Sequence, residues 1–362
     1  MSNPAGNGST RRPGLIDCDV HNVVPSQAAL HPYLSPKWRS YSEKVGTRTY
    51  LPYLSGYHYP KVSRGAARAD AWSPDGHAPG TDLDFLRKQL LDEYDIDYAV
   101  LNCLYRAPEE RNEAYGAALA SAVNDWQIDH WLEPEKRLRA SALVPFENPA
   151  AAAAEVRRCA QHPGFVQVLL FPRTKEPLGR RKYWPIYEAA AERGLPVGIH
   201  FSSTTANPIT AGGWPSFYIE DHTMMAVAFQ AQLTSLIVEG VFDSFPELKL
   251  VLIEGGFAWI PSLLRRLDDV YERVRDEVPH LRRRPSEYLR DRVRVTTQPM
   301  EEPERPRDLV DLITEIGPET LMFSTDYPHW DFDNPHRAFQ VRLPADLDQR
   351  IMYENARDCY AF

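Results

Sequence analysis

Hydrophobic and polar positions divide the chain into short apolar runs separated by longer amphipathic stretches. The apolar runs predict eight strands, at 15–21, 97–103, 138–145, 164–170, 196–200, 248–254, 292–297 and 321–326. The stretches between them predict helices at about 82–94, 109–132, 149–161, 183–193 and 221–239, then between 254 and 275, at 306–316 and at 345–360. Thr81 or Asp82 could cap the first of these helices, and Gly194 suits the end of the fourth.

This alternation indicates a parallel sheet, because strands separated by helical crossovers run in one direction. Eight such units in 362 residues predict an α/β fold of the (β/α)8 type, a TIM barrel. A doubly wound open sheet is the alternative. No GxGxxG motif follows the first predicted strand, which weakens a nucleotide-binding version of that alternative.

The chain outside the repeating pattern predicts a simple domain organisation. Residues 1–13 are expected to form a flexible tail, and residues 14–362 a single barrel domain. Residues 22–80 carry little periodicity but many Tyr, Trp, Pro and Gly residues. A loop of this length inside a compact domain is usually functional, and its aromatic content favours an ordered insert over disorder. We therefore expect an insert after the first strand that covers the active-site face.

Charge and composition narrow the possible partners. The net charge is −9 and the pI is near 5.7, which argues against nucleic acid or an anionic membrane surface. No apolar run reaches the roughly 18 residues of a membrane helix, and residues 1–13 lack a secretory apolar core. The four cysteines lie far apart without a CxxC motif, which favours a reduced, cytoplasmic location. A small-molecule substrate is the expected partner; the oligomeric state is not readable, although large barrels often form homo-oligomers.

The first predicted strand carries unusual charge. Strand side chains alternate between faces, so Asp17, Asp19 and His21 are expected on one face, with Cys18 and Val20 on the other. Two carboxylates and an imidazole would be costly to bury without a partner. A divalent cation would satisfy them, since carboxylate oxygen and imidazole nitrogen are ordinary metal ligands.

Polar residues also end several other predicted strands. His21, His200, Glu254 and Asp326 each close an apolar run, and the active residues of a barrel lie at these C-terminal strand ends. Each has an ordinary alternative: a hydrogen-bonded loop histidine, a solvated glutamate, or an aspartate that caps a turn. Their common position at strand ends favours one shared site.

The same residues carry a resemblance to a known family. The stretches concerned are 17–21, 198–200, 242–249, 254–261, 323–331 and 355–356. From Ile16 to about Ala356 the chain resembles the amidohydrolase-related (amidohydrolase-2) family of metal-dependent hydrolases and decarboxylases, which includes aminocarboxymuconate-semialdehyde and γ-resorcylate decarboxylases. These motifs are specific for the family but not for one reaction.

The resemblance implies a barrel with one divalent metal ion held by Asp19, His21, His200 and Asp326. Zn²⁺ is the expected ion. Asp19 stands where many members have histidine, and the resulting oxygen-rich set makes Mn²⁺ or Fe²⁺ alternatives. Glu254 stands where many members have the histidine that acts as catalytic base, so the base is open between Glu254 and His222. Asp326 is expected to accept a proton from bound water as well as to hold the metal.

Candidate substrate-binding residues lie in the insert and after the last strand. They are His329, Arg48, Tyr57 and Trp72, with His58 and Tyr59 beside Tyr57. The alternative roles are structural packing for the residues of the insert, stabilisation of a turn for His329 and solvation for Arg48. Their aromatic character hints at a flat, aromatic substrate.

The expected enzyme acts on a small organic carboxylate or carbonyl compound, by metal-activated hydrolysis or by non-oxidative decarboxylation. A metal-free barrel that binds a small molecule without turnover is the alternative. A purely structural protein gives no reason for ligand-type residues at four strand ends.

Overall fold

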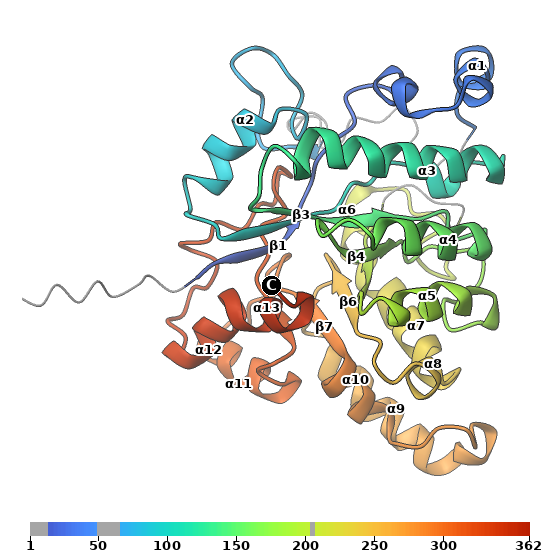
Figure 1. Ribbon diagram of the computed structural model, residues 1–362. Coiled ribbons are helices and arrows are strands. Elements are labelled where there is room, and N and C mark those ends of the chain that lie inside the picture. Colours follow the sequence, from blue (N-terminus) through green and yellow to red (C-terminus); the bar gives the residue numbers. More distant parts are fainter. Residues whose placement is uncertain (1–13, 49–65, 203–206) are drawn as a thin grey trace, which may run out of the picture.

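The fold is a closed barrel of eight parallel strands (Figure 1). A computed structural model describes residues 14–48, 66–202 and 207–362 of the chain. The strands are β1 (Ile16–Val20), β2 (Tyr98–Leu101), β3 (Leu138–Leu143), β4 (Phe165–Leu170), β5 (Val197–His200), β6 (Leu250–Ile253), β7 (Val293–Thr296) and β8 (Leu321–Met322). Each strand pairs with the next in sequence order, and every pairing is parallel. All eight strands lie where the hydrophobic pattern predicts them.

Backbone contacts between the first strand and the chain after the last one close the barrel. The amide of Cys18 donates to the carbonyl of Phe323 at 3.0 Å, and the amide of Asp326 donates to the carbonyl of Asp19, also at 3.0 Å. An open doubly wound sheet would have two free edges here. The (β/α)8 prediction is therefore confirmed.

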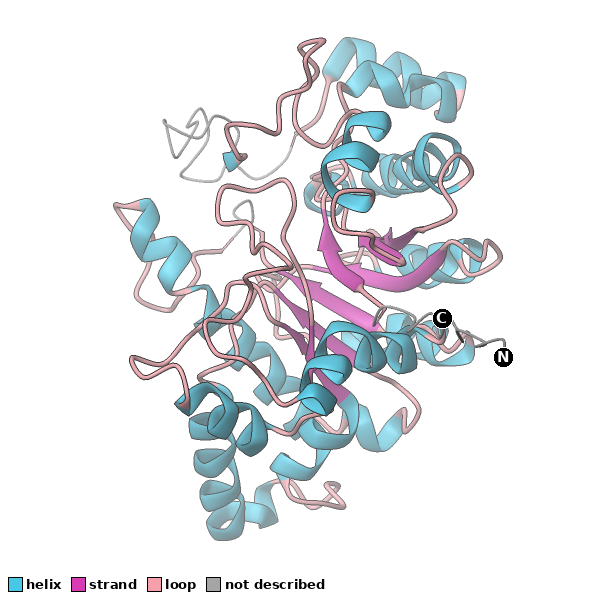
Figure 2. Cartoon of the chain, turned by 90° about the vertical axis from the view of Figure 1, so that its left-hand side faces the viewer, coloured by secondary structure: helices cyan, strands magenta, loops and turns pink. Residues whose placement is uncertain are grey.

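Helices surround the strands (Figure 2). They are α1 (Pro36–Val45), α2 (Leu83–Leu86), α3 (Glu113–Gln127), α4 (Pro149–Cys159), α5 (Trp184–Glu192), α6 (Tyr218–Thr223), α7 (Met225–Val238), α8 (Val241–Ser244), α9 (Ile260–Val274), α10 (Pro285–Arg292), α11 (Asp308–Ile316), α12 (Ala345–Gln349) and α13 (Asn355–Tyr360). π-helical turns extend three of them, at Arg87–Leu91, Ile128–Leu132 and Arg350–Glu354. Asp82, one of the two caps that the sequence allows, caps α2 by accepting a hydrogen bond from the Phe85 amide.

Two boundaries differ from the predicted ones in ways that matter for the site. The helix predicted at 221–239 is divided into α6 and α7, and α6 begins earlier, at Tyr218. The last strand is only two residues long, where the apolar run predicts 321–326. The chain leaves the β ladder early, and Asp326 adopts a left-handed backbone conformation with φ of 59°. Local apolar character does not reveal such a departure.

The strict alternation expected along β1 does not hold. The register with β2 shifts between Asp17 and Val20. Cys18 packs in a small apolar cluster with Ile16 and with α13, whereas Val20 belongs to the large core between strands and helices. The Asp17 carboxylate accepts hydrogen bonds from the amide and hydroxyl of Thr325 instead of joining Asp19 and His21. A one-residue irregularity reassigns side chains between faces.

The described parts of the predicted insert reach the C-terminal end of the barrel. The Arg68 amide donates to the carbonyl of Pro328, and the Trp330 amide donates to the carbonyl of Ala66. The segment at 66–68 therefore lies along the chain that follows β8. Among the described residues, no helix is long and apolar enough to cross a membrane.

Candidate metal centre and adjoining cavity

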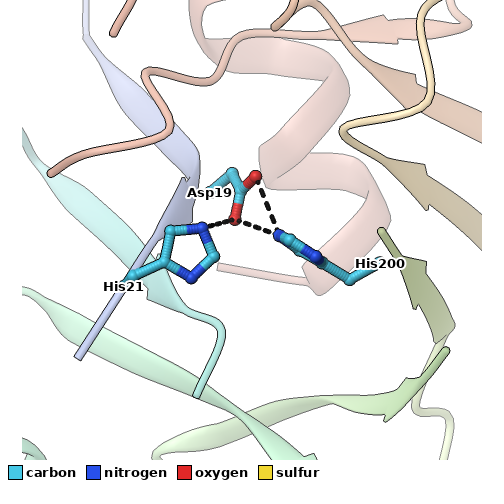
Figure 3. A group of neighbouring side chains, drawn as sticks. All are labelled: Asp19, His21 and His200. Atoms are coloured by element: carbon cyan, nitrogen blue, oxygen red, sulfur yellow. Dashed lines mark hydrogen bonds and ion pairs between the residues drawn. The ribbon is translucent and has the colours of Figure 1, made fainter. Parts of the chain in front are cut away.

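Four predicted ligands meet at the C-terminal end of the barrel. Asp19 lies in β1, His21 directly follows it, His200 ends β5, and Asp326 lies beyond β8. His21 Nε2 is 2.8 Å from Asp326 Oδ1 and 3.4 Å from Asp19 Oδ1. His200 Nε2 is 3.2 Å from both oxygens of Asp19 (Figure 3). All four side chains are at most 3% exposed.

The hydrogen bonds of the two histidines leave their Nε2 atoms directed at carboxylates. His21 Nδ1 donates to the carbonyl of Asn102 at 2.7 Å, and His200 Nδ1 donates to the carbonyl of Phe201 at 2.5 Å. In a neutral imidazole, donation from Nδ1 makes Nε2 an acceptor. Each Nε2 lone pair would then face a carboxylate oxygen, which is repulsive unless a cation lies between them.

An unsatisfied oxygen supports the same conclusion. Asp326 is fully buried, and no residue in the described part of the chain forms a hydrogen bond with its Oδ2. A buried carboxylate oxygen without a partner is costly. Burial alone would raise the pKa of Asp326, but that pKa is lowered, and the charge of His329 is the largest of the effects that lower it. Two carboxylates and two Nε2 atoms fit a divalent cation, and Asp19, His21, His200 and Asp326 are the residues that would hold it.

A chain of polar side chains inside the barrel orients Asp19. The Asn102 side-chain amide donates to Asp19 Oδ1 at 2.8 Å. Asn102 Oδ1 accepts from the Ser141 hydroxyl at 2.6 Å, and that hydroxyl accepts from the Gln167 amide at 2.8 Å. Such partners of metal ligands typically fix their orientation. Sequence reasoning did not find Asn102, although it directly follows β2.

A second cluster adjoins the first. His222 Nε2 is 3.2 Å from Asp331 Oδ2, and both lie near the carboxylate of Glu254, with all three ligand atoms within 4.8 Å of one another. Glu254 is 6% exposed and has a left-handed backbone, with φ of 58°. Burial, and then the charge of Asp326, raise the pKa of Glu254 well above its usual value. The two predicted acid–base candidates, Glu254 and His222, are thus neighbours, and Asp331 is a partner that sequence reasoning missed.

A cavity of about 310 Å³ opens beside the metal ligands. It is lined by His21, Asn22, Val23, Val24, Thr47, Cys103, Leu104, Tyr105, Arg106 and His329. Arg106 brings a positive charge, although its Nε and Nη2 already donate to Glu109. Burial raises the pKa of Tyr105 to about 12, so its hydroxyl stays neutral. The cavity is therefore mainly apolar, and Arg106, His329 and the proposed metal ligand His21 are the basic residues among those that line it.

Of the predicted substrate-binding residues that the structure describes, only His329 lines the cavity. His329 lines the cavity, and its Nδ1 lies 2.7 Å from Asp326 Oδ1. Arg48 is exposed and Trp72 half-buried, and neither is among the lining residues. Tyr57, with His58 and Tyr59, lies outside the described residues. The roles of Arg48, Trp72 and Tyr57 therefore remain predictions, and Arg106, which follows β2, is the residue that sequence reasoning missed.

Comparison with known families agrees with this geometry. The family model described as Amidohydrolase matches residues 16–362. The chain belongs to the amidohydrolase family. It is therefore an enzyme, and the alternative of a barrel that binds without turnover is not supported.

Relatives and solved structures of this family include several decarboxylases. The chain is 28% identical over 305 residues to a γ-resorcylate decarboxylase of Rhodococcus jostii, covering 76% of this chain and 89% of the relative. A dihydroxybenzoic acid decarboxylase from a Polaromonas species, solved with manganese and 2-nitroresorcinol, superposes with a TM-score of 0.65 at 20% identity and covers 96% of this chain and 97% of its own. A manganese-bound 5-carboxyvanillate decarboxylase from Novosphingobium aromaticivorans gives 0.73 at 19% identity and covers both chains fully.

Proposed function

We propose that this enzyme catalyses the metal-dependent, non-oxidative decarboxylation of a hydroxylated aromatic carboxylate. The observation that carries the proposal is the cluster of Asp19, His21, His200 and Asp326 next to a cavity whose lining includes His21, His329 and Arg106. The volume of about 310 Å³ suits a substrate with a single ring. The decarboxylase relatives favour this reaction over hydrolysis.

A divalent ion at the four ligands would supply positive charge that holds the substrate carboxylate and a neighbouring oxygen. Zn²⁺ suits the ligand set, and Mn²⁺ occupies two of the structural neighbours. Arg106 would contact the substrate's acidic groups, and Tyr105 and Leu104 would pack against the ring. His329 would contact a substrate oxygen through its Nε2, because its Nδ1 is engaged by Asp326.

The chemical step requires a proton on carbon. The bond between the ring carbon and the carboxylate breaks and releases CO2, and its electron pair takes a proton to form a C–H bond. Glu254 is the proton donor in this proposal, since it is buried beside His200 with its Oε2 3.7 Å from His200 Nδ1. His222, 20% exposed, would return a proton from solvent to Glu254. Net, one carboxylate and one proton give the arene and CO2.

The test is a substrate panel with metal-loaded enzyme. Purified enzyme is stripped, reconstituted separately with Mn²⁺ and Zn²⁺, and incubated with ortho-hydroxybenzoates such as 2,6-dihydroxybenzoate. We expect stoichiometric CO2 and the corresponding phenol, and neither from the stripped enzyme or His200→Ala. Turnover of esters or amides without CO2 release would instead identify a hydrolase and reject the proposal.

A further inference from the structure

The cluster of His222, Glu254 and Asp331 has the composition of a cation site in its own right. Its members come from three places in the fold: α6, the end of β6 and the chain after β8. One ligand atom from each lies within 4.8 Å of the others. Two carboxylates and one imidazole form a common ligand set for divalent transition metals. None of the three is a proposed ligand of the first ion.

Glu254 is nearly buried beside the first cluster. Its side chain is 7% exposed, and no described residue donates a hydrogen bond to its carboxylate. Its contact with His200 Nδ1, at 3.7 Å, is too long for a hydrogen bond, and that N–H is already donated to Phe201. A buried carboxylate of this kind, directed at two further ligand groups, is the feature that a cation would satisfy.

The charge of the region points the same way. Four carboxylates lie together at this end of the barrel, those of Asp19, Asp326, Glu254 and Asp331. Within the described ranges, their ion pairs are all with histidines, and no lysine or arginine pairs with any of them. An ion at the first site would be held by Asp19 and Asp326 and would leave the carboxylates of Glu254 and Asp331 without a metal partner.

We propose that His222, Glu254 and Asp331 form a second, weaker site for a divalent transition metal such as Mn²⁺ or Zn²⁺. It would be weaker than the first because it offers three ligands instead of four and because His222 and Asp331 are 20% and 15% exposed. If Glu254 and His222 move the proton, an ion on them stops that transfer. Excess metal would then inhibit the enzyme, a consequence that rests on the proposed function, whereas the binding itself does not.

The binding test counts metal ions and uses no substrate. Metal-free, full-length protein is dialysed against increasing Mn²⁺, and bound metal is measured by elemental analysis. We expect two classes, one tight and one weak, each of about one equivalent. Asp331→Asn and His222→Asn should each raise the dissociation constant of the weak class by at least about tenfold and leave the tight class unchanged.

Two further variants serve as controls for the metal count. His200→Ala should lose the tight class, and Asp333→Asn, which removes a nearby carboxyl outside the cluster, should keep both. A single class in the wild type, or a weak class that neither Asp331→Asn nor His222→Asn changes, would overturn the second site. Circular dichroism confirms that each variant is folded before its metal is counted. Because CO2 release is measured separately, failure of the decarboxylase proposal would leave this count unaffected.

Discussion

The side-chain amide of Asn102 donates a 2.8 Å hydrogen bond to Asp19 Oδ1, while the backbone carbonyl of Asn102 accepts a hydrogen bond from His21 Nδ1. One residue at the end of β2 therefore orients two ligands from β1. Replacing it by Leu should weaken binding of the first metal ion about 10–100-fold, since the partners of ligands typically contribute that much. Equilibrium dialysis with Mn²⁺ measures the change.

Ser141 provides a graded comparison for this effect. Ser141→Ala removes the next link in the chain and leaves the bond from Asn102 to Asp19 in place. Its effect on metal affinity should be smaller than that of Asn102→Leu. Equal effects of the two variants, or an unchanged affinity in Asn102→Leu, would show that this chain does not position Asp19.

Removal of the metal should destabilise the folded protein. Without the ion, His21 Nε2 lies within 3.4 Å of carboxylate oxygens of both Asp19 and Asp326, and Asp326 Oδ2 has no hydrogen-bond partner among the described residues. A ligand at 1,000 times its dissociation constant stabilises the native state by about 4 kcal/mol. Differential scanning calorimetry should therefore show a lower apparent midpoint after chelation, restored by Mn²⁺ or Zn²⁺.

The ligand variants should lose this response. Asp19→Ala and His200→Ala are expected to retain no metal after dialysis while keeping the circular dichroism spectrum of the barrel. Their midpoints should be the same with and without metal added at concentrations that fill only the tight class. Stoichiometric metal in either purified variant would reject the ligand set.

Substitutions of Glu254 and His222 should lower the reaction rate without removing the tightly bound metal, unlike substitutions of the proposed metal ligands. Glu254→Gln keeps the shape of the side chain but removes the transferable proton, and the rate should fall by about 10²–10⁴-fold. The tight metal class should remain. His222→Asn should reduce the rate less, because solvent can replace a group that is already 20% exposed. A fully active Glu254→Gln enzyme would show that another group donates the proton.

Arg106 and Arg48 allow a comparison between an arginine in the cavity and one on the surface. Arg106 lines the cavity, whereas Arg48 is exposed and does not. Arg106→Met should raise KM for a carboxylate substrate about tenfold, since Glu109 and solvent already weaken its charge, and a tenfold change corresponds to about 1.4 kcal/mol. Arg48→Met should leave KM within about twofold. Steady-state kinetics decide between them, and the reverse ranking would restore the sequence-based role of Arg48.

Gly198 in β5 leaves room for the amide that supports this network. A Cβ at this position would lie 2.5 Å from Gln167 Nε2. Gly198→Ala should therefore lower the free energy of unfolding by about 1–3 kcal/mol through overpacking, as judged by urea denaturation. In Gln167→Ala the space is open, so adding Gly198→Ala to that variant should cost much less. Additive losses in the double variant would contradict this explanation.

The sequence determined the order of elements and predicted the four residues proposed to hold the metal. Apolar runs are short-range features, and the rule that parallel strands of a barrel end on one face places His21 and His200 together without coordinates. The same rule would have found Asn102 and Arg106 had polar residues just beyond β2 been considered.

Only the tertiary structure decided how these residues are used. The register shift in β1 separates Asp17 from Asp19, and the early end of β8 carries Asp326 to the ligands. The pairing of His222 with Asp331 joins segments 109 positions apart. Hydrophobic periodicity reports which face of an element is buried, but the contacts between loops depend on the closure of the barrel, which no local pattern encodes.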